Sequence, residues 1–285
     1  MAKVPLPEKL FRYRPILTSQ QLLYVISEIK ECNLYLSRPE DFNDIFDAVS
    51  ILSKENLYEY FKESSQLNEI ISLVNRVYEI YGNTSTHDDV ERLKNVKMDF
   101  WVDTNNHYNQ ILGEVRVACF TESHQNMPMW AHYANNHQGV CLQYNPATFL
   151  NAWSRERLFS VKYTKQMPDI ISEILLTKKR KITFKTIESI VTKKHEDWRY
   201  EKEWRLILHK GHFYSKENDV PKEFYKFGKL VVFEKPSKVY LGYKVSTDVE
   251  ELFRSVLENT GVEIVKMEMT AFGLFEKRIN AAEKK

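Results

Sequence analysis

The sequence contains little glycine. Eight glycines occur in 285 residues, and they are widely scattered. Rossmann folds and P-loop proteins need closely spaced glycines, because their backbone must approach a phosphate group. No pair of glycines here has that spacing, which argues against an ordinary dehydrogenase, kinase or P-loop ATPase. The H-E-x-x-H and G-x-S-x-G motifs are also absent, which argues against a zinc peptidase or a hydrolase with a nucleophile elbow.

The chain also has few cysteines and no long apolar run. Its three cysteines, Cys32, Cys119 and Cys141, lie far apart and show no C-x-x-C spacing. This pattern argues against a disulfide framework or a zinc ribbon and favours a reducing compartment. No stretch of about 20 apolar residues is present to span a bilayer, and the opening MAKVPLPEKLF lacks the apolar core of an export signal. We therefore expect a cytoplasmic protein without a membrane partner.

Composition and apolar periodicity predict a folded α+β protein. Hydrophobic residues make up 43% and charged residues 28% of the chain, as in soluble folded proteins. Alternating apolar residues predict several strands, and residues 66–81 carry apolar side chains at helical spacing. We found no repeat or proline-rich linker, so we expect one domain over residues 1–285 with a helical insertion at about 52–112.

Basic residues are concentrated in one part of the sequence. Residues 151–210 contain 15 Lys or Arg against 8 Asp or Glu, although the whole chain has a net charge of only +2. Two stretches in this part, about residues 167–180 and 183–197, are predicted to be mostly helical, and the basic segment 178–194 lies across them. A basic helical face is able to dock RNA or DNA through phosphate contacts, but lysine-rich helix faces are also common as plain solvated surface.

The first candidate site segment is FRYR, residues 11–14. Strand alternation places Arg12 and Arg14 on one face and Tyr13 on the other. Two adjacent guanidinium groups suit a phosphate or carboxylate, because each offers a planar fork of donors. A second segment, SRPEDFNDIFD, contains Asn43 and Asp44, whose side chains either stabilise a turn or face a ligand.

Two later segments combine polar and aromatic residues. Thr121 and Ser123 share a face at the end of a predicted strand, and Trp130 and Tyr133 lie one helical turn apart, where they either form core or stack on a ring. The segment WRYEKEWR places Glu201, Glu203 and Arg205 on one face, which we predict to be the outward one. Such carboxylates are suited to stabilising an oxocarbenium-like transition state, although a surface salt-bridge ladder is the structural alternative.

These segments together resemble a bacterial domain family of unknown function whose members are often found beside phage-defence genes. The resemblance covers about residues 9–245. Within that range, the sequence differs from the family in the predicted helical insertion at about 52–112. Ile45 also stands where the family loop has proline, which bears on the rigidity of that loop. The motifs that carry it are, in order, FRYRP, SRPEDFNDIFD, CFTES, MWAHY, GVCLQY, W-x-x-E-x-E-W-R and VYLGYKVS.

The order of these segments is similar to that in ADP-ribosyltransferases, which carry a basic residue, a Ser or Thr cluster and an E-x-E glutamate on successive strands. This likeness implies a split mixed or antiparallel sheet core and NAD as the substrate. It implies Glu203 and Glu201 as catalytic residues, with Glu203 orienting the nicotinamide ribose. The implied NAD-binding residues are Arg12, Tyr13, Arg14, Asn43, Asp44, Thr121, Ser123, Trp130, Tyr133 and Arg205.

The expected function is therefore an NAD-dependent ADP-ribosyltransferase that acts as a toxin or phage-defence effector on RNA, DNA or a protein. An antitoxin or inhibitor protein is a further expected partner. Two alternatives stay open. One is a metal-dependent nuclease that uses Asp44, Asp47, Glu201 and Glu203 as cation ligands. The other is a non-catalytic sensor or interaction module, in which the polar residues only brace the fold.

Overall fold

The chain divides into two compact units in the computed structural model. The first unit comprises residues 1–38, 116–163 and 196–285, and the second comprises residues 39–115 and 164–195. The single domain expected from the sequence stays a prediction, and the helical insertion lies outside the described residues except for 108–112, which are helical. The structure describes residues 4–42, 44, 47, 108–148, 156–169, 173, 183–209, 225–226 and 230–277.

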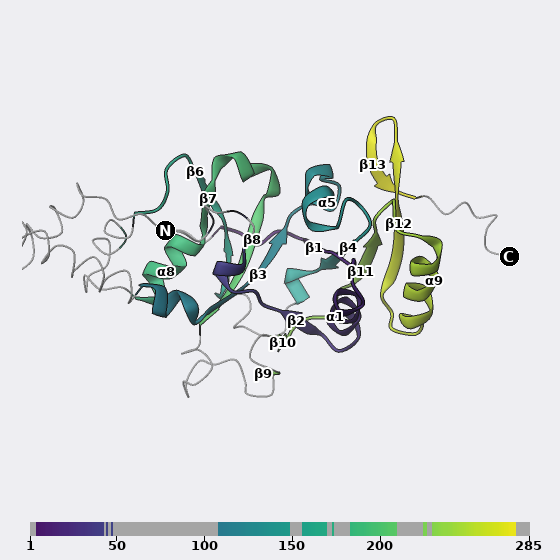
Figure 1. Ribbon diagram of the computed structural model, residues 1–285, viewed down its shortest axis with the longest axis horizontal. Coiled ribbons are helices and arrows are strands. Elements are labelled where there is room, and N and C mark those ends of the chain that lie inside the picture. Colours follow the sequence, from purple (N-terminus) through teal and green to yellow (C-terminus); the bar gives the residue numbers. More distant parts are fainter. Residues whose placement is uncertain are drawn as a thin grey trace, which may run out of the picture. The chain divides into compact units, whose positions relative to one another are not determined.

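An eight-stranded sheet forms the centre of the first unit (Figure 1). Its strands are β1 (Leu10–Arg14), β3 (Val115–Thr121), β4 (Val140–Tyr144), β5 (Leu158–Ser160), β8 (Glu203–His209), β11 (Lys238–Leu241), β12 (Glu263–Thr270) and β13 (Gly273–Glu276). They are ordered β13-β12-β11-β4-β1-β3-β8-β5. The pair β11–β12 is parallel, whereas β1 is antiparallel to both β3 and β4. The predicted α+β class with a mixed sheet is confirmed.

Three helices accompany this sheet: α1 (Ser19–Lys30), α5 (Met127–Tyr133) and α9 (Thr247–Val256). Helix α1 begins where Thr18 and Gln21 form a reciprocal capping box, which satisfies two free backbone donors. Short elements complete the unit: β2 (Asn33–Tyr35), β9 (Tyr225–Lys226) and β10 (Leu230–Val232), which form a small sheet, β6 (Lys162–Thr164), and the 3-10 helices η2 (Pro146–Thr148) and η3 (Glu196–Glu201).

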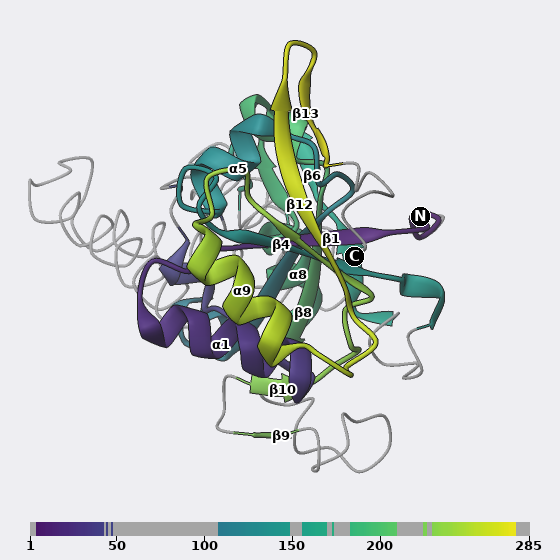
Figure 2. The ribbon, with the colours of Figure 1, turned by 90° about the vertical axis from the view of Figure 1, so that its right-hand side faces the viewer.

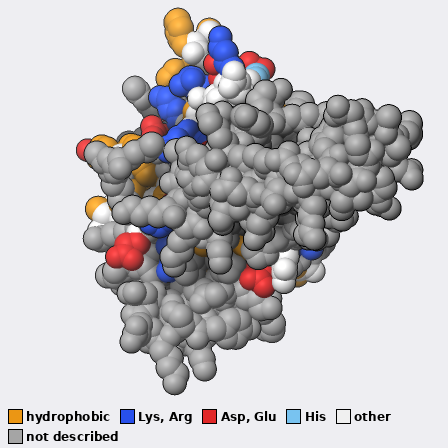
Figure 3. All heavy atoms as spheres, turned by 90° about the vertical axis from the view of Figure 1, so that its left-hand side faces the viewer, with side chains coloured by type: hydrophobic (Ala, Val, Ile, Leu, Met, Phe, Trp, Pro, Cys, Tyr) orange, Lys and Arg blue, Asp and Glu red, His pale blue; other side chains and the backbone are white. Residues whose placement is uncertain are grey.

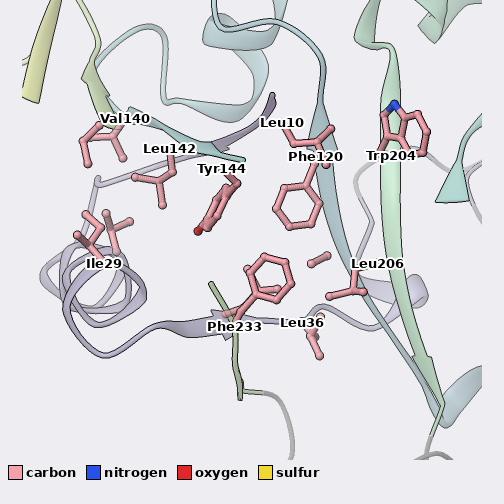
Figure 4. Close-up of a cluster of buried hydrophobic side chains, with 14 of the residues drawn as sticks. Leu10, Ile29, Leu36, Phe120, Val140, Leu142, Tyr144, Trp204, Leu206 and Phe233 are labelled. Carbon is pink, nitrogen blue, oxygen red and sulfur yellow. The ribbon is translucent and has the colours of Figure 1, made fainter. Parts of the chain in front are cut away.

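The two faces of the large sheet carry separate apolar cores. One core joins alternate sheet residues to α1 and α9, which lie side by side in Figure 2. Phe120, Tyr144 and Phe233 meet there at ring-centroid distances of 5.6 to 5.9 Å (Figure 4). The other core contains Tyr13, Trp130 and Tyr240, so it belongs to the face covered by α5. Strand alternation therefore decides which helix each sheet residue meets.

Two glycines allow the central strands to approach a neighbouring turn. The backbone N–H of Gly242 donates to the carbonyl of Gly139 at 2.9 Å. A Cβ at Gly242 would overlap the His137 carbonyl oxygen, and one at Gly139 would overlap the Arg14 carbonyl oxygen. These glycines are required by close backbone packing, not by an unusual dihedral angle.

We expect Gly242→Ala to lower the free energy of unfolding by about 1–3 kcal/mol, because backbone atoms must move to admit the methyl group. Urea unfolding of the purified protein measures this loss. Gly113→Ala is the matched control, since a Cβ there meets nothing within 4 Å. Equal stability of Gly242→Ala and the parent protein would contradict the packing argument.

The second unit contains η1 (Pro39–Asp41), α8 (Phe184–Val191) and β7 (Lys193–His195). The helical prediction for residues 183–197 is confirmed in α8, but Lys193–His195 form the strand β7 instead of continuing the helix. Lys194 is 4% exposed and pairs with Asp47 at 3.4 Å, and Lys193 pairs with Glu173. These two lysines therefore form ion pairs within the second unit. Residues 178–181 lie outside the described ranges.

The described surface in Figure 3 shows Lys and Arg side chains interspersed with acidic and apolar ones. Docking of RNA or DNA through the segment 178–194 stays a prediction. We no longer expect Lys193 and Lys194 to contact the nucleic acid, because both are paired with carboxylates of the protein. Among the residues that the structure describes, no helix is both long enough and apolar enough to cross a membrane.

Candidate functional site

Two buried glutamates lie at the start of β8. Glu201 ends η3 and Glu203 begins β8, with Lys202 between them at a positive φ of 45°. Glu201 is 1% exposed and Glu203 is 5% exposed. The prediction that both side chains point outward into solvent is wrong. The side chains of Trp204 and Leu206 enter the α1 core, so alternation directs Glu203 to the α5 face.

Arg205 holds the carboxylate of Glu203. Its Nε donates to Oε1 at 2.8 Å and its Nη2 donates to Oε2 at 3.0 Å. Arg205 is fully buried, and the two residues are neighbours on the same face of one strand. The hydroxyl of Tyr163 accepts the backbone N–H of Glu203 at 2.7 Å. This charge-assisted pair is geometrically strong, and it keeps the Glu203 side chain in one orientation.

The carboxylate of Glu201 is held from α5. The Tyr133 hydroxyl donates to its Oε1 at 2.7 Å, and the Thr121 hydroxyl donates to the Glu201 carbonyl. The side-chain amide of Asn126 donates to the carbonyl of Tyr200 at 2.8 Å. Helix α5 and the end of β3 therefore fix η3 in place. We call Glu201, Glu203, Arg205 and Tyr133 the carboxylate cluster.

Half-exposed aromatic side chains lie around the carboxylate cluster. The ring of Trp198 is 5.9 Å from that of His132 and 6.0 Å from that of Tyr200, measured between centroids. The guanidinium of Arg199 lies 5.6 Å from the centroid of the Tyr163 ring. The sequence-based site lacked Trp198 and Tyr163. Trp198 lies within the W-x-x-E-x-E-W-R segment, so its closeness to the glutamates in the sequence could have predicted its place in the site. No sequence pattern indicated Tyr163.

The N-terminal arginines do not join this cluster. Arg12 and Arg14 share a face of β1 as predicted, but it is the face covered by α1. Each lies 3.5 Å from a carboxylate oxygen of the buried Glu28. The expected convergence of these arginines with Glu203 is therefore wrong. Sequence reasoning missed Glu28, although it occupies the buried stripe of α1 with Val25 and Ile29.

Three other predicted residues have structural roles beside α5. Trp130 is fully buried in the apolar core, where its indole N–H donates to the His124 carbonyl at 2.6 Å. Its ring packs in the apolar core with Tyr13 and Tyr240 and is not part of the carboxylate cluster, which corrects the prediction that it covers a ligand ring. The Tyr13 hydroxyl donates to the Ser123 carbonyl at 3.0 Å, and the Ser123 hydroxyl accepts the N–H of Gln125 at 3.2 Å. Of the predicted aromatic pair, only Tyr133 reaches the cluster.

The acidic loop that follows β2 is only partly described. Asn43 lies outside the described residues, and Asp44 and Asp47 belong to the second unit. The described ranges contain no group of three or more His, Cys, Asp or Glu side chains arranged to hold a metal ion. Asp47 is paired with Lys194 and Glu203 with Arg205. The nuclease alternative stays a prediction.

Burial of His124, in the loop before α5, is expected to make the stability of the protein depend on pH. Its ring stacks on Tyr240 at 4.2 Å, and burial lowers its pKa below 6.5, only partly offset by Glu276. The unfolded chain therefore binds a proton more readily, so stability is lost as the pH falls through about 6.5. We expect His124→Phe to weaken this loss between about pH 7 and pH 5, measured by urea unfolding. His132→Phe, at an exposed position, is the control; identical pH dependence in all three proteins would refute the assignment.

Comparison with known proteins gives one match. A family model described as Protein of unknown function (DUF2971) matches residues 129–206, a range that contains most of α5, all of η3 and the first half of β8. The match is consistent with an uncharacterised domain family, and its range includes every member of the carboxylate cluster. No curated protein and no solved structure matches the chain.

Proposed function

We propose that the protein is an NAD-dependent ADP-ribosyltransferase whose reaction centre is the carboxylate cluster. The observation that carries this proposal is the burial of two oriented glutamate carboxylates on one side of the sheet, beside half-exposed aromatic rings. Buried carboxylates act strongly on a developing positive charge, because little water screens them. Aromatic side chains at the rim suit the flat nicotinamide and adenine rings.

The proposed reaction breaks the bond between the anomeric carbon of the nicotinamide ribose and the pyridinium nitrogen. Nicotinamide leaves with the bonding electron pair, and an oxocarbenium-like ribose remains. An oxygen or nitrogen of the acceptor donates an electron pair to the anomeric carbon and loses its proton to solvent. Glu201 stabilises the cationic ribose, and Tyr133 orients the Glu201 carboxylate. Arg205 holds Glu203 in position to bond a ribose hydroxyl.

The phosphates of NAD need a cation on this face of the sheet. Arg12 and Arg14 face α1, so they do not serve this reaction centre. Arg199 is exposed, belongs to the same 3-10 helix as Glu201 and lies over the Tyr163 ring. We therefore assign the pyrophosphate contact to Arg199 in this proposal. The acceptor is a nucleic acid or a protein, and the biological role is that of a toxin or phage-defence effector with an inhibitor partner.

Incubation with NAD labelled in the adenine ring and in the nicotinamide tests the proposal. Total RNA, DNA and protein from a bacterial lysate serve as separate acceptors. We expect nicotinamide release together with transfer of adenine label to one of the three. Absence of both release and transfer, with all acceptors, would overturn it. Nicotinamide release without transfer would reduce the activity to NAD hydrolysis, in which water is the acceptor, and would also contradict the transferase assignment.

A non-catalytic module is the second candidate. Arg205 occupies both carboxylate oxygens of Glu203, as expected of a group that braces the fold. In a bacterial assay of the protein's toxicity or phage protection, a folded Glu201→Gln, Glu203→Gln double variant distinguishes the two. Loss of the effect favours catalysis, and full retention favours the module.

A further inference from the structure

A second polar cluster lies beneath α1, on the sheet face away from the carboxylate cluster. It consists of Arg12, Arg14, Glu28, Tyr35 and Tyr144, and we call it the arginine cluster. Arg12 Nε and Arg14 Nε each lie 3.5 Å from an oxygen of Glu28. Arg12 Nη2 donates to the Tyr35 carbonyl at 2.7 Å, and the Tyr144 hydroxyl donates to Glu28 Oε1 at 2.7 Å. Two strand residues thus share a single helix carboxylate.

Among the described residues, the charges of this cluster do not balance. Two guanidinium groups face one carboxylate, and burial together with Glu28 raises the pKa of Tyr144 well above its usual value, so that tyrosine is neutral. Arg12 is 5% exposed and Glu28 is 1% exposed. Burial lowers the pKa of Arg14, but arginine stays protonated in proteins. An excess positive charge therefore sits in a poorly hydrated place, where an anion would be favoured.

One buried guanidinium donor of this cluster has no acceptor among the described residues. Arg12 Nη1 is buried and has no hydrogen-bond partner among the described residues. Arg14 Nε and Glu28 Oε2 also make no hydrogen bond, but they face each other at 3.5 Å as an ion pair. The Arg14 side chain is 15% exposed, so it connects the cluster to solvent. Buried guanidinium donors are normally paired, because an unpaired one loses its hydration without compensation. The unpaired Arg12 Nη1, in a cluster with two guanidinium groups and one carboxylate, points to a missing acceptor.

We propose that the arginine cluster binds a phosphate group. Phosphate carries up to two negative charges and several acceptor oxygens, which match an excess cation and two forked donors. Next to Arg14, the ring of Tyr35 lies 5.9 Å from its guanidinium and stacks on Tyr24 at a centroid distance of 5.9 Å. Tyr24 is 38% exposed, so this aromatic pair is accessible to a base. The phosphate therefore comes from a nucleotide or from free phosphate.

Thermal unfolding of the full chain tests this site. We expect inorganic phosphate to raise the Tm of the parent protein by several degrees relative to sodium chloride of equal ionic strength, because the ligand binds only the folded state. Arg14→Gln leaves Arg12 and Glu28 as a balanced pair, so it should fold and should bind phosphate at least tenfold more weakly. Arg254→Gln removes the same charge from an exposed pair and is the matched control.

Two outcomes would overturn the proposal. One is a parent Tm that is equal in phosphate and in chloride. The other is a phosphate response of Arg14→Gln equal to that of Arg254→Gln. AMP and ADP, tested in the same way, identify the source of the phosphate group. If either nucleotide binds at least tenfold more tightly than inorganic phosphate, and this binding is lost in Arg14→Gln, the ligand is a nucleotide. If the nucleotides and inorganic phosphate bind equally, the ligand is free phosphate. Glu201→Gln should keep the full phosphate response, so failure of the proposed catalysis and failure of this site are distinguishable.

Discussion

Replacing Glu201 by glutamine is expected to reduce nicotinamide release from NAD by about 100-fold or more while the protein stays folded. The amide has the shape of the carboxylate and still accepts the hydrogen bond from the Tyr133 hydroxyl. It removes only the negative charge that would stabilise the ribose cation, and loss of one such electrostatic contact typically costs about 10²–10³ in kcat. Initial rates of nicotinamide release, with the Tm measured in parallel, give the result.

Tyr133→Phe is the companion variant for this prediction. It deletes one hydrogen bond to Glu201 and leaves the charge in place, so we expect a smaller fall in kcat than for Glu201→Gln. A Glu201→Gln protein with the rate and the Tm of its parent would assign the cluster a role outside catalysis. A rate that falls only in proportion to lost folded protein would lead to the same conclusion.

Removing one member of the Glu203–Arg205 pair is expected to lower the free energy of unfolding by about 3–5 kcal/mol. Both side chains are buried, and Arg205 lies fully inside the first unit. Glu203→Met or Arg205→Met alone therefore leaves an uncompensated charge away from water. The double variant replaces the pair by two apolar side chains and should recover most of the loss, because removing a whole buried pair is often nearly neutral. Urea unfolding of the four proteins completes this cycle.

The exposed pair between Arg254 and Glu250 provides the control for the buried one. Its nitrogen and oxygen are 2.7 Å apart, but the Arg254 side chain is 49% exposed. Exposed ion pairs of this kind contribute about 0.2–1 kcal/mol, so Arg254→Met should change stability little. If Arg205→Met and Arg254→Met were equally mild, the buried pair would not brace the fold. If the double variant were as unstable as the singles, then packing, not charge, would explain the loss.

The local pattern of the sequence was sufficient for central strands of the large sheet, such as β1 and β8, and for the faces on which their side chains lie. The alternation in β1 correctly separates Arg12 and Arg14 from Tyr13, and that in β8 separates Glu203 and Arg205 from Trp204. The first helix was also predictable, since Thr18 and Gln21 supply a capping box before an amphipathic segment. These features depend on residues a few positions apart, and period two or a helix cap follows from such neighbours alone.

Which helix packs against each face of the sheet depended on the order of the strands in space. Strand β3 lies between β1 and β8, and helix α1 covers the arginine face while α5 covers the glutamate face. Glu28 pairs with arginines more than ten residues earlier, and Tyr133 meets Glu201 across 68 positions of the chain. Linear spacing carries no information about such long-range contacts. The sequence by itself determined the α+β class and the chemical groups on each strand face; only tertiary packing decided which groups meet, because the same alternation permits either helix on either face.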